Sequence, residues 1–257
     1  MATLNSRPVD GRPDNNKSNT NKVYDTTKST VSLAKVFGYM ALGLLITAAV
    51  AFGFGYVFSL LLNKDAEKAF STLLIVLVAS CIVQFILTIV MNFVFLRGKH
   101  SILIPYILYT VCMGFMLSTF TIFIDWRILG MAFGITSIAF LAMTLVAVLF
   151  RKSNMNGLAV AAMGLFLGAG LLALSTFLFS LWQPGLFQSF YWIIEFAIFG
   201  AIMLITIWDL WRINKLSENG AMNKNLSLYC AFNIYVDFLN IFIRVVYYLL
   251  IIFSNKK

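Results

Sequence analysis

Residues 226–253, LSLYCAFNIYVDFLNIFIRVVYYLLIIF, decide the fold of this chain. The stretch is long enough to cross a membrane as an α-helix, because about 20 apolar residues span the hydrocarbon core of a bilayer. Its amide-bearing and charged side chains are Asn233, Asp237, Asn240 and Arg244. All four fall within about 60° of one another on a helical wheel. Such a stripe is costly against lipid, so we expect it to face other helices or a water-filled cavity, with this segment at the centre of a bundle.

The composition of the whole chain is that of a membrane protein. Of its 257 residues, 61% are hydrophobic and 11% are charged, with a mean hydropathy of +0.89. A soluble domain has about 25% charged residues. The apolar runs are continuous, whereas barrel strands would alternate over about 10 residues. We therefore expect an all-α membrane protein, a seven-transmembrane-helix bundle with the seventh helix central. The seven apolar segments are 33–62, 70–96, 102–124, 128–150, 158–181, 187–212 and 226–253.

The polar N-terminal region differs from the rest. Residues 1–30 are rich in Asn, Thr, Ser, Asp and Lys, include Pro8 and Pro13, and contain no apolar run. This composition is typical of a disordered tail. We expect two parts, a disordered polar tail over 1–30 on the cytosolic side and a transmembrane domain over 31–257.

The positions of Lys and Arg predict the orientation. With the N-terminus inside, thirteen basic residues lie on the cytosolic side and five outside, while Arg244 lies within a segment. This bias follows the positive-inside rule and accounts for the net charge of +9 without nucleic acid as a partner. Seven spans then place the C-terminus outside. The short tail and loops favour a bacterial-type cytoplasmic membrane, with an internal eukaryotic membrane as the alternative.

Two aspartates lie in the last two apolar segments, Asp209 in the sixth and Asp237 in the seventh. An ionisable group at membrane depth costs several kcal/mol and is by default a candidate functional site. Two carboxylates in one low-dielectric site cannot both ionise freely, so a pair would form a proton or cation site. Asp209 lies only about 3 residues, or roughly 5 Å, inside its predicted segment, against about 11 residues, or roughly 16 Å, for Asp237. The two meet only if the sixth helix continues to about Leu216.

The same residues also have purely structural interpretations. The stripe of the seventh segment can be a buried hydrogen-bond network that fixes helix packing. Asp209 precedes Arg212 by three residues and can form a surface ion pair with it. The neighbouring Trp208 and Trp211 are typical of an interfacial aromatic belt. A proton or ion pathway competes with these interpretations because acid, base and amide groups are all present.

Glu195 is a third carboxylate within an apolar segment. It lies 14 residues before Asp209, which places both on one face of the sixth helix, roughly 21 Å apart. Glu195 either marks the outer mouth of a pathway or is a first-turn acid that stabilises the N-terminus of its helix.

Other candidate residues carry no predicted chemistry. Gly164 and Gly168 form a GxxxG motif, which predicts close helix packing in the fifth segment. Cys81, Cys112 and Cys230 lie in apolar segments without CxxC spacing and are predicted to be small buried hydrophobes. We expect no cofactor.

The residues around both aspartates carry a resemblance to a known family. The run NIYVDFLNIF, residues 233–242, resembles the signature of the Bax-inhibitor-like, or transmembrane Bax inhibitor motif, family, which has Tyr-x-Asp-Phe-hydrophobic-Asn in its last helix. The stretch IWDL, residues 207–210, resembles the family's second acidic site, with Trp in place of the usual Tyr. Residues 33–45, LAKVFGYMALGLL, are similar to its first helix.

The resemblance implies a function and roles for residues. It implies a pH-sensitive calcium leak of the bacterial type in which Asp209 and Asp237 share a proton and hold calcium only in transit. It also implies a basic latch near the end of the second helix, for which Arg97 is the candidate and Lys99 lies close by. Calcium is then a permeant ion rather than a cofactor. We expect a non-enzymatic protein that works as a monomer in the lipid bilayer, with protein partners unknown.

Two other functions place acidic residues in membrane helices. A proton- or ion-coupled secondary transporter would be marked by internal repeats and broken helices, and no clear repeat is present. An intramembrane aspartyl protease also has aspartates on helices six and seven, but it needs Gly-x-Gly-Asp before the second one. The chain has Ile234-Tyr235-Val236-Asp237 there.

Overall fold

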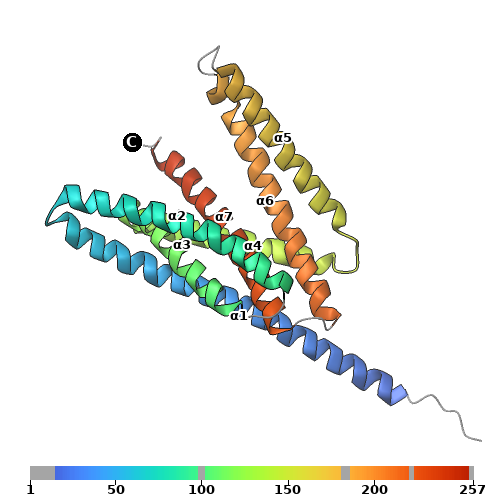
Figure 1. The fold of residues 1–257 in the computed structure, drawn as a ribbon. Helices are drawn as coiled ribbons and strands as arrows, with labels where there is room; N and C mark the ends of the chain where they lie inside the picture. Colours follow the sequence, from blue (N-terminus) through green and yellow to red (C-terminus); the bar gives the residue numbers. More distant parts are fainter. Residues whose placement is uncertain (1–14, 98–101, 181–185, 220–222, 255–257) are drawn as a thin grey trace, which may run out of the picture.

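Seven helices make up the described part of the chain, and no strand occurs there. The computed structural model describes residues 15–97, 102–180, 186–219 and 223–254, and side chains over 33–93, 102–178, 190–219 and 223–254 (Figure 1). Each helix contains an apolar stretch long enough to cross a membrane, as the composition predicts. The helices are α1 (Asn15–Leu62), α2 (Ala66–Arg97), α3 (Leu103–Phe123), α4 (Trp126–Leu149), α5 (Asn156–Ser180), α6 (Leu186–Glu218) and α7 (Lys224–Ser254).

Helix α7 is the central element of the bundle. It contacts α1, α2, α3, α4 and α6, and of the other helices only α5 lies away from it. In Figure 1, α5 and α6 form an antiparallel pair that projects from one side, while α1, α2 and α3 lie together on the other. Helix α7 passes between these two groups. The predicted central position of the seventh helix is therefore confirmed.

One side chain of α7 joins three helices. Tyr235 is fully buried, and its hydroxyl oxygen lies 2.5 Å from Oγ1 of Thr47 in α1. The same Oγ1 lies 3.1 Å from the carbonyl oxygen of Thr110 in α3. The rings of Tyr106 and Tyr109, both in α3, meet the Tyr235 ring edge to face. A hydroxyl that is satisfied in this way can be buried without the cost of an unpaired polar atom.

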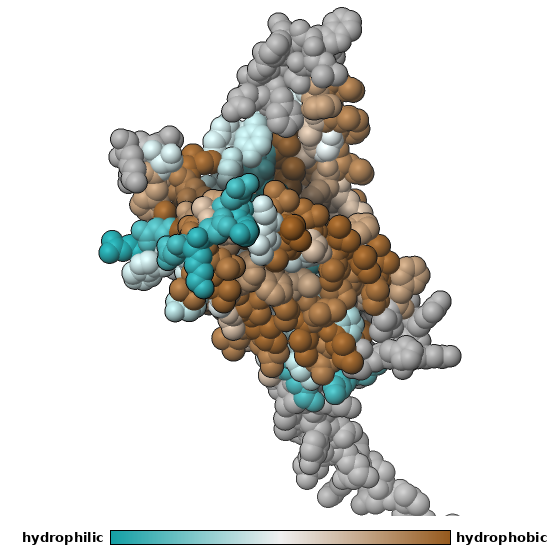
Figure 2. Space-filling model, turned by 60° about the vertical axis from the view of Figure 1, so that its left-hand side comes forward, coloured by the Kyte–Doolittle hydropathy of each residue, from teal (hydrophilic) through white to brown (hydrophobic). Residues whose placement is uncertain are grey.

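The outer surface is apolar, as a lipid-facing surface requires. Large side chains such as Phe85 in α2 and Leu167 in α5 are each 70% exposed. Figure 2 shows hydrophobic residues covering most of one face, with hydrophilic residues gathered in limited regions. Exposed apolar patches of this extent are typical of a surface in contact with a membrane rather than with water.

The predicted boundary of the N-terminal tail differs from the structure. Helix α1 begins at Asn15, so residues 15–30, which we predicted to be disordered, are helical. Between Asn15 and Phe37 the chain contains neither Gly nor Pro, so no residue there breaks a helix that continues from the apolar part. Residues 1–14 of the predicted tail lie outside the described residues.

Close helix packing involves α1 and α3 rather than the GxxxG motif. A Cβ atom added at Gly164 or Gly168 would meet no described atom within 4 Å, so the predicted close packing there is wrong. A Cβ atom at Gly114 of α3 would lie 2.6 Å from Cβ of Val50 and 2.8 Å from the carbonyl oxygen of Thr47. Gly114 therefore lets α3 approach α1 closely enough for the Thr47 hydroxyl to reach α3.

We predict that Gly114→Ala destabilises the protein, because the added methyl group would overlap the α1 backbone. Overpacking of this kind costs about 1–3 kcal/mol. Thermal unfolding in detergent, followed by circular dichroism, would measure the loss as a lower midpoint. Gly164→Ala is the matched control, and its midpoint should equal or exceed that of the wild type. Equal midpoints for the two variants would contradict the close contact.

Candidate functional site

Helix α6 is long enough to place Asp209 well inside the bundle. The sequence predicted that the segment ends at residue 212, but α6 continues to Glu218. Asp209 lies nine residues before that end, and Asp237 lies thirteen residues after the start of α7. At 1.5 Å per residue these depths are about 14 and 20 Å, so the condition for the two aspartates to meet is fulfilled.

The last turns of α6 are amphipathic: one face is packed in the bundle and the other carries charged side chains. Their mean hydropathy is therefore low although they belong to a packed helix. Asn214 and Ser217 are buried, on the side that faces the other helices. Arg212 is exposed, with its guanidinium 5.3 Å from the centre of the Trp208 ring, and Lys215 Nζ lies 4.2 Å from the centre of the Trp211 ring. Cations that lie over aromatic rings at a helix end keep their charge near water while their stems cover apolar surface.

Asp237 presents one carboxylate oxygen to the interior without a partner. Its Oδ2 atom is buried and has no hydrogen-bond partner among the described residues. The Thr206 side chain of α6 lies beside the same carboxyl group, while its hydroxyl donates to the carbonyl oxygen of Ile202 at 2.9 Å. A buried carboxylate that is incompletely paired is costly while it is ionised. A proton or a cation at this position would remove that cost.

Thr206 also fixes which face of α6 meets Asp237. Thr206 is fully buried and lies three residues before Asp209, so the two side chains occupy one face, about one turn apart. Asp209 lies close enough to Asp237 for their charges to interact. It interacts in the same way with Cys230, two turns earlier on α7. The half-buried Asp209 therefore lies at the α6–α7 contact, opposite the part of α7 between Cys230 and Asp237.

The alternative interpretation of Asp209, a surface ion pair with Arg212, accounts for only part of what surrounds this side chain. The charge of Arg212 acts on Asp209, but no salt bridge joins them within the described side chains. Arg212 instead lies over Trp208 and toward the exposed side of α6. Asp209 thus lies between an exposed cation on its own helix and a buried acid on the next.

The latch candidate Arg97 is the last residue of α2, and its side chain lies outside the described residues, as does Lys99 altogether. The backbone of this helix end is nevertheless placed. The Tyr229 hydroxyl of α7 donates to Oδ1 of Asn92 at 2.8 Å. The end of α2 therefore lies beside the first turns of α7, at the end of the bundle that also holds Asp209.

The remaining stripe residues of α7 separate into two groups. Asn233 is half-buried, one turn before Asp237. Asn240 and Arg244, one and two turns after it, line a cavity of about 500 Å³ together with Glu195 of α6. Arg244 Nη1 and Glu195 Oε1 form an ion pair. Both residues stand out in the sequence, but their pairing does not, because neither helix alone determines how the two are aligned.

The metal-ligating side chains of the described residues are not clustered. No group of three or more His, Cys, Asp or Glu side chains that could hold a metal ion occurs among the residues searched. Calcium takes six to eight oxygen ligands in its stable sites. Asp209 and Asp237 together supply four carboxylate oxygens.

Seven apolar helices around a polar, carboxylate-bearing interior define a multi-pass integral membrane protein. The family model described as "Inhibitor of apoptosis-promoting Bax1" matches residues 30–255. The chain therefore belongs to this Bax-inhibitor-like family, as the motif around Asp237 indicated. Membership supports a membrane function of the ion-channel type in general terms. No curated protein and no solved structure matches the chain.

We predict that cysteines introduced by Thr206→Cys and Asp237→Cys form a disulfide on mild oxidation, because the two native side chains lie beside each other across α6 and α7. The background would lack the three native cysteines, and a protease site in the 219–223 loop would reveal the cross-link as two fragments that remain joined. Glu195→Cys with Asp237→Cys is the control, since Glu195 lies about 16 Å farther along α6. Cross-linking of the control alone, or of neither pair, would contradict the geometry.

Proposed function

We propose that the protein is a passive, pH-sensitive cation leak in the membrane, with calcium as a permeant ion and the Asp209–Asp237 pair as its gate. The observation that carries this proposal is the unpartnered buried oxygen of Asp237, which lies within electrostatic range of a second carboxylate on the neighbouring helix. The membership of the chain in a family of the ion-channel type supports it.

The gate would work through the charge of the pair. With a proton shared between the two acids, the site carries one negative charge and the helices stay together. When both acids ionise, repulsion and hydration favour separation of α6 and α7. Two charges 4 Å apart at an effective dielectric constant of about 20 repel by about 4 kcal/mol. That energy is of the size that separates two conformations of a protein, so it suffices to change their populations.

The orientation of the pathway follows from the basic residues. We place the N-terminus and the α6–α7 loop in the cytosol and the C-terminus outside, so that Asp209 and Asp237 lie toward the cytosolic end. The end of α2 lies there too, and Arg97 is the candidate latch that would bind Asp209 in the closed state. In this proposal the protein works as a monomer in a bacterial-type cytoplasmic membrane, with no cofactor and no enzymatic step.

The helices themselves favour a leak over a coupled transporter. Transporters of the inverted-repeat type build their sites from broken helices near the membrane midplane. Helices α6 and α7, which carry every acid of the proposed pathway, each run without interruption over their described ranges. An aspartyl protease is disfavoured by the residues before Asp237, which lack the glycines that such a site requires.

We predict that calcium flux into liposomes containing the purified protein rises between about pH 5 and pH 8, because deprotonation of the pair opens the gate. Asp209→Asn and Asp237→Asn cannot ionise at the altered position, so each should hold the flux near its low-pH value across the range. A calcium-sensitive dye inside the vesicles would measure the initial rate. The same pH profile in both variants and the wild type would refute the gate.

Asp65→Asn is the matched control for these variants. Asp65 lies between α1 and α2 and outside the apolar spans, where its hydrogen bond and ion pair with Lys68 lower its pKa. It therefore stays ionised over the tested range, and its replacement should leave the pH profile unchanged. Accumulation of calcium against its gradient, driven by a pH gradient, would identify a coupled transporter instead of a leak.

A further inference from the structure

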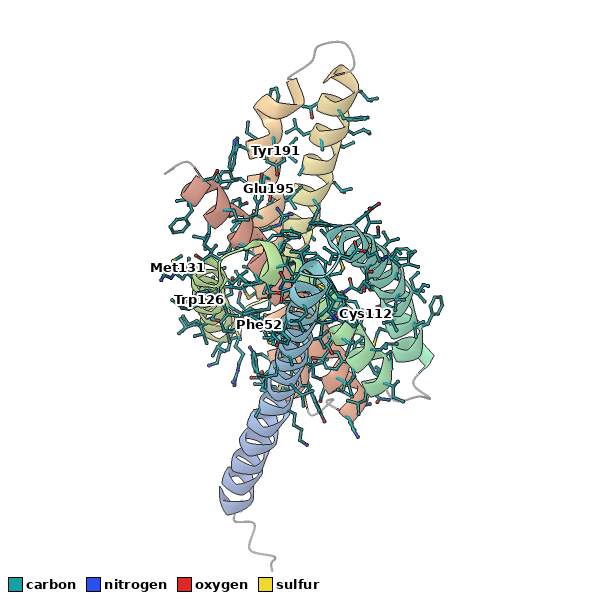
Figure 3. The ribbon with its side chains drawn as sticks, turned by 90° about the vertical axis from the view of Figure 1, so that its left-hand side faces the viewer. Phe52, Cys112, Trp126, Met131, Tyr191 and Glu195 are labelled. Atoms are coloured by element: carbon teal, nitrogen blue, oxygen red, sulfur yellow. The ribbon has the colours of Figure 1, made fainter. Side chains whose placement is uncertain are left out.

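The cavity that holds Arg244 and Glu195 is built differently from the aspartate site. It lies between α6 and α7, with Phe120 of α3 and Phe166 of α5 also in its lining. Figure 3 shows Glu195 and Tyr191 on the same stretch of α6, in the part of that helix away from the α6–α7 loop. At about 500 Å³ the cavity has room for several water molecules, each of which occupies about 30 Å³ in the liquid.

The charged groups of the cavity are one acid and one base. The side chains of Glu195 and Arg244 are 14% and 21% exposed, and they form the ion pair directly. The lining contains no other charged side chain. Each charge is thus balanced directly by the other, and removal of one side chain would leave the other buried without its ion-pair partner.

Neutral oxygen atoms surround this pair. The Tyr191 hydroxyl donates to the Tyr247 hydroxyl at 3.1 Å, and both tyrosines line the cavity. Asn240 adds an amide to the same lining, and the Tyr248 side chain lies within range of both charges. Carboxylate, amide and hydroxyl oxygens are ligands of the kind that hard cations such as calcium bind.

We propose that Glu195 is a second cation site, and that Arg244 acts as a tethered competitor whose guanidinium occupies it. A divalent cation that reaches Glu195 must displace Arg244 or share the cavity with its positive charge. Arg244 lies two turns from Asp237 on one face of α7, so the cavity and the aspartate site lie on the same side of this helix. This inference rests on the proposed leak, in which the Glu195–Arg244 pair sets how readily cations enter from the end of the bundle opposite the α6–α7 loop.

Terbium binding tests the site without any flux. Tb³⁺ substitutes for calcium at oxygen sites and emits when a nearby excited tyrosine transfers energy to it, and Tyr191, Tyr247 and Tyr248 surround the pair. The assay uses the full chain in detergent with Asp209→Asn and Asp237→Asn, so that the proposed gate contributes no signal. In this background, Arg244→Gln should bind Tb³⁺ at least tenfold more tightly than its parent, and calcium should displace it.

Two further variants make the result decisive. Arg244→Gln combined with Glu195→Gln should lose the sensitised emission, because the carboxylate is the ligand. Arg244→Lys keeps a positive charge near Glu195 but lacks the planar fork of the guanidinium, so its affinity should fall between those of the parent and Arg244→Gln. If Arg244→Gln does not fold, the Tb³⁺ affinity of Arg244→Lys relative to its parent decides whether the proposal holds. Emission that is independent of Glu195, or an unchanged affinity in Arg244→Lys, would overturn the proposal.

Flux then separates this inference from the proposed function. In the otherwise wild-type chain, Arg244→Gln should raise calcium flux severalfold at every pH while the pH dependence set by Asp209 and Asp237 remains. If no variant conducts calcium but the terbium results hold, the leak is wrong and the second cation site stands. If flux depends on the aspartates but Arg244→Gln leaves both terbium binding and flux unchanged, the leak stands and the second site is wrong.

Discussion

The cost of exposing polar groups to hydrocarbon is the constraint on which the rest of this structure depends. Helix α7 carries a line of amide and charged groups through a stretch that is otherwise apolar, and lipid cannot satisfy them. Packing against α1, α2, α3, α4 and α6 takes most of this line out of contact with lipid, and only Asn240 among its four residues is exposed. The same packing gives the Tyr235 hydroxyl a partner in Thr47 of α1 and places Thr206 of α6 beside Asp237.

The features that a single helix determines could be predicted from the sequence. The seven spans follow from apolar runs, and the central place of α7 follows from the spacing of Asn233, Asp237, Asn240 and Arg244. Contacts that depend on the alignment of two helices were harder to predict, and that between Asp209 and Asp237 was predicted only on the condition that the sixth helix continues. Glu195 and Arg244 were each selected, but their pairing depends on how far α6 slides along α7. The end of α6 was placed too early because Arg212 and Lys215 lower the local hydropathy, although both lie over tryptophan rings of the same helix.

The spacing of glycines predicted helix–helix contacts less well than the positions of polar residues did. Gly164 and Gly168 have the spacing of a packing motif, yet α5 has no close neighbour at them among the described atoms. Gly114 has no motif around it and allows the closest approach of α1 to α3. A missing side chain permits contact but does not attract a partner, whereas a buried hydroxyl or carboxylate must find one. Polar residues therefore carry more information about helix neighbours in this chain.

The junction of Tyr235, Thr47 and Thr110 has a consequence for how the molecule can move. It ties α7 to α1 and α3 two residues before Asp237, so this half of α7 is anchored to the larger group of helices. Helix α6 packs most extensively on α5, and together they project from that group (Figure 1). In the proposed gate, a change in the distance between the two acids would therefore be a movement of the α5–α6 hairpin relative to α7. In such a movement α7 would stay fixed, and the hairpin would move as a rigid body that carries Asp209 near one end of α6 and Glu195 toward the other.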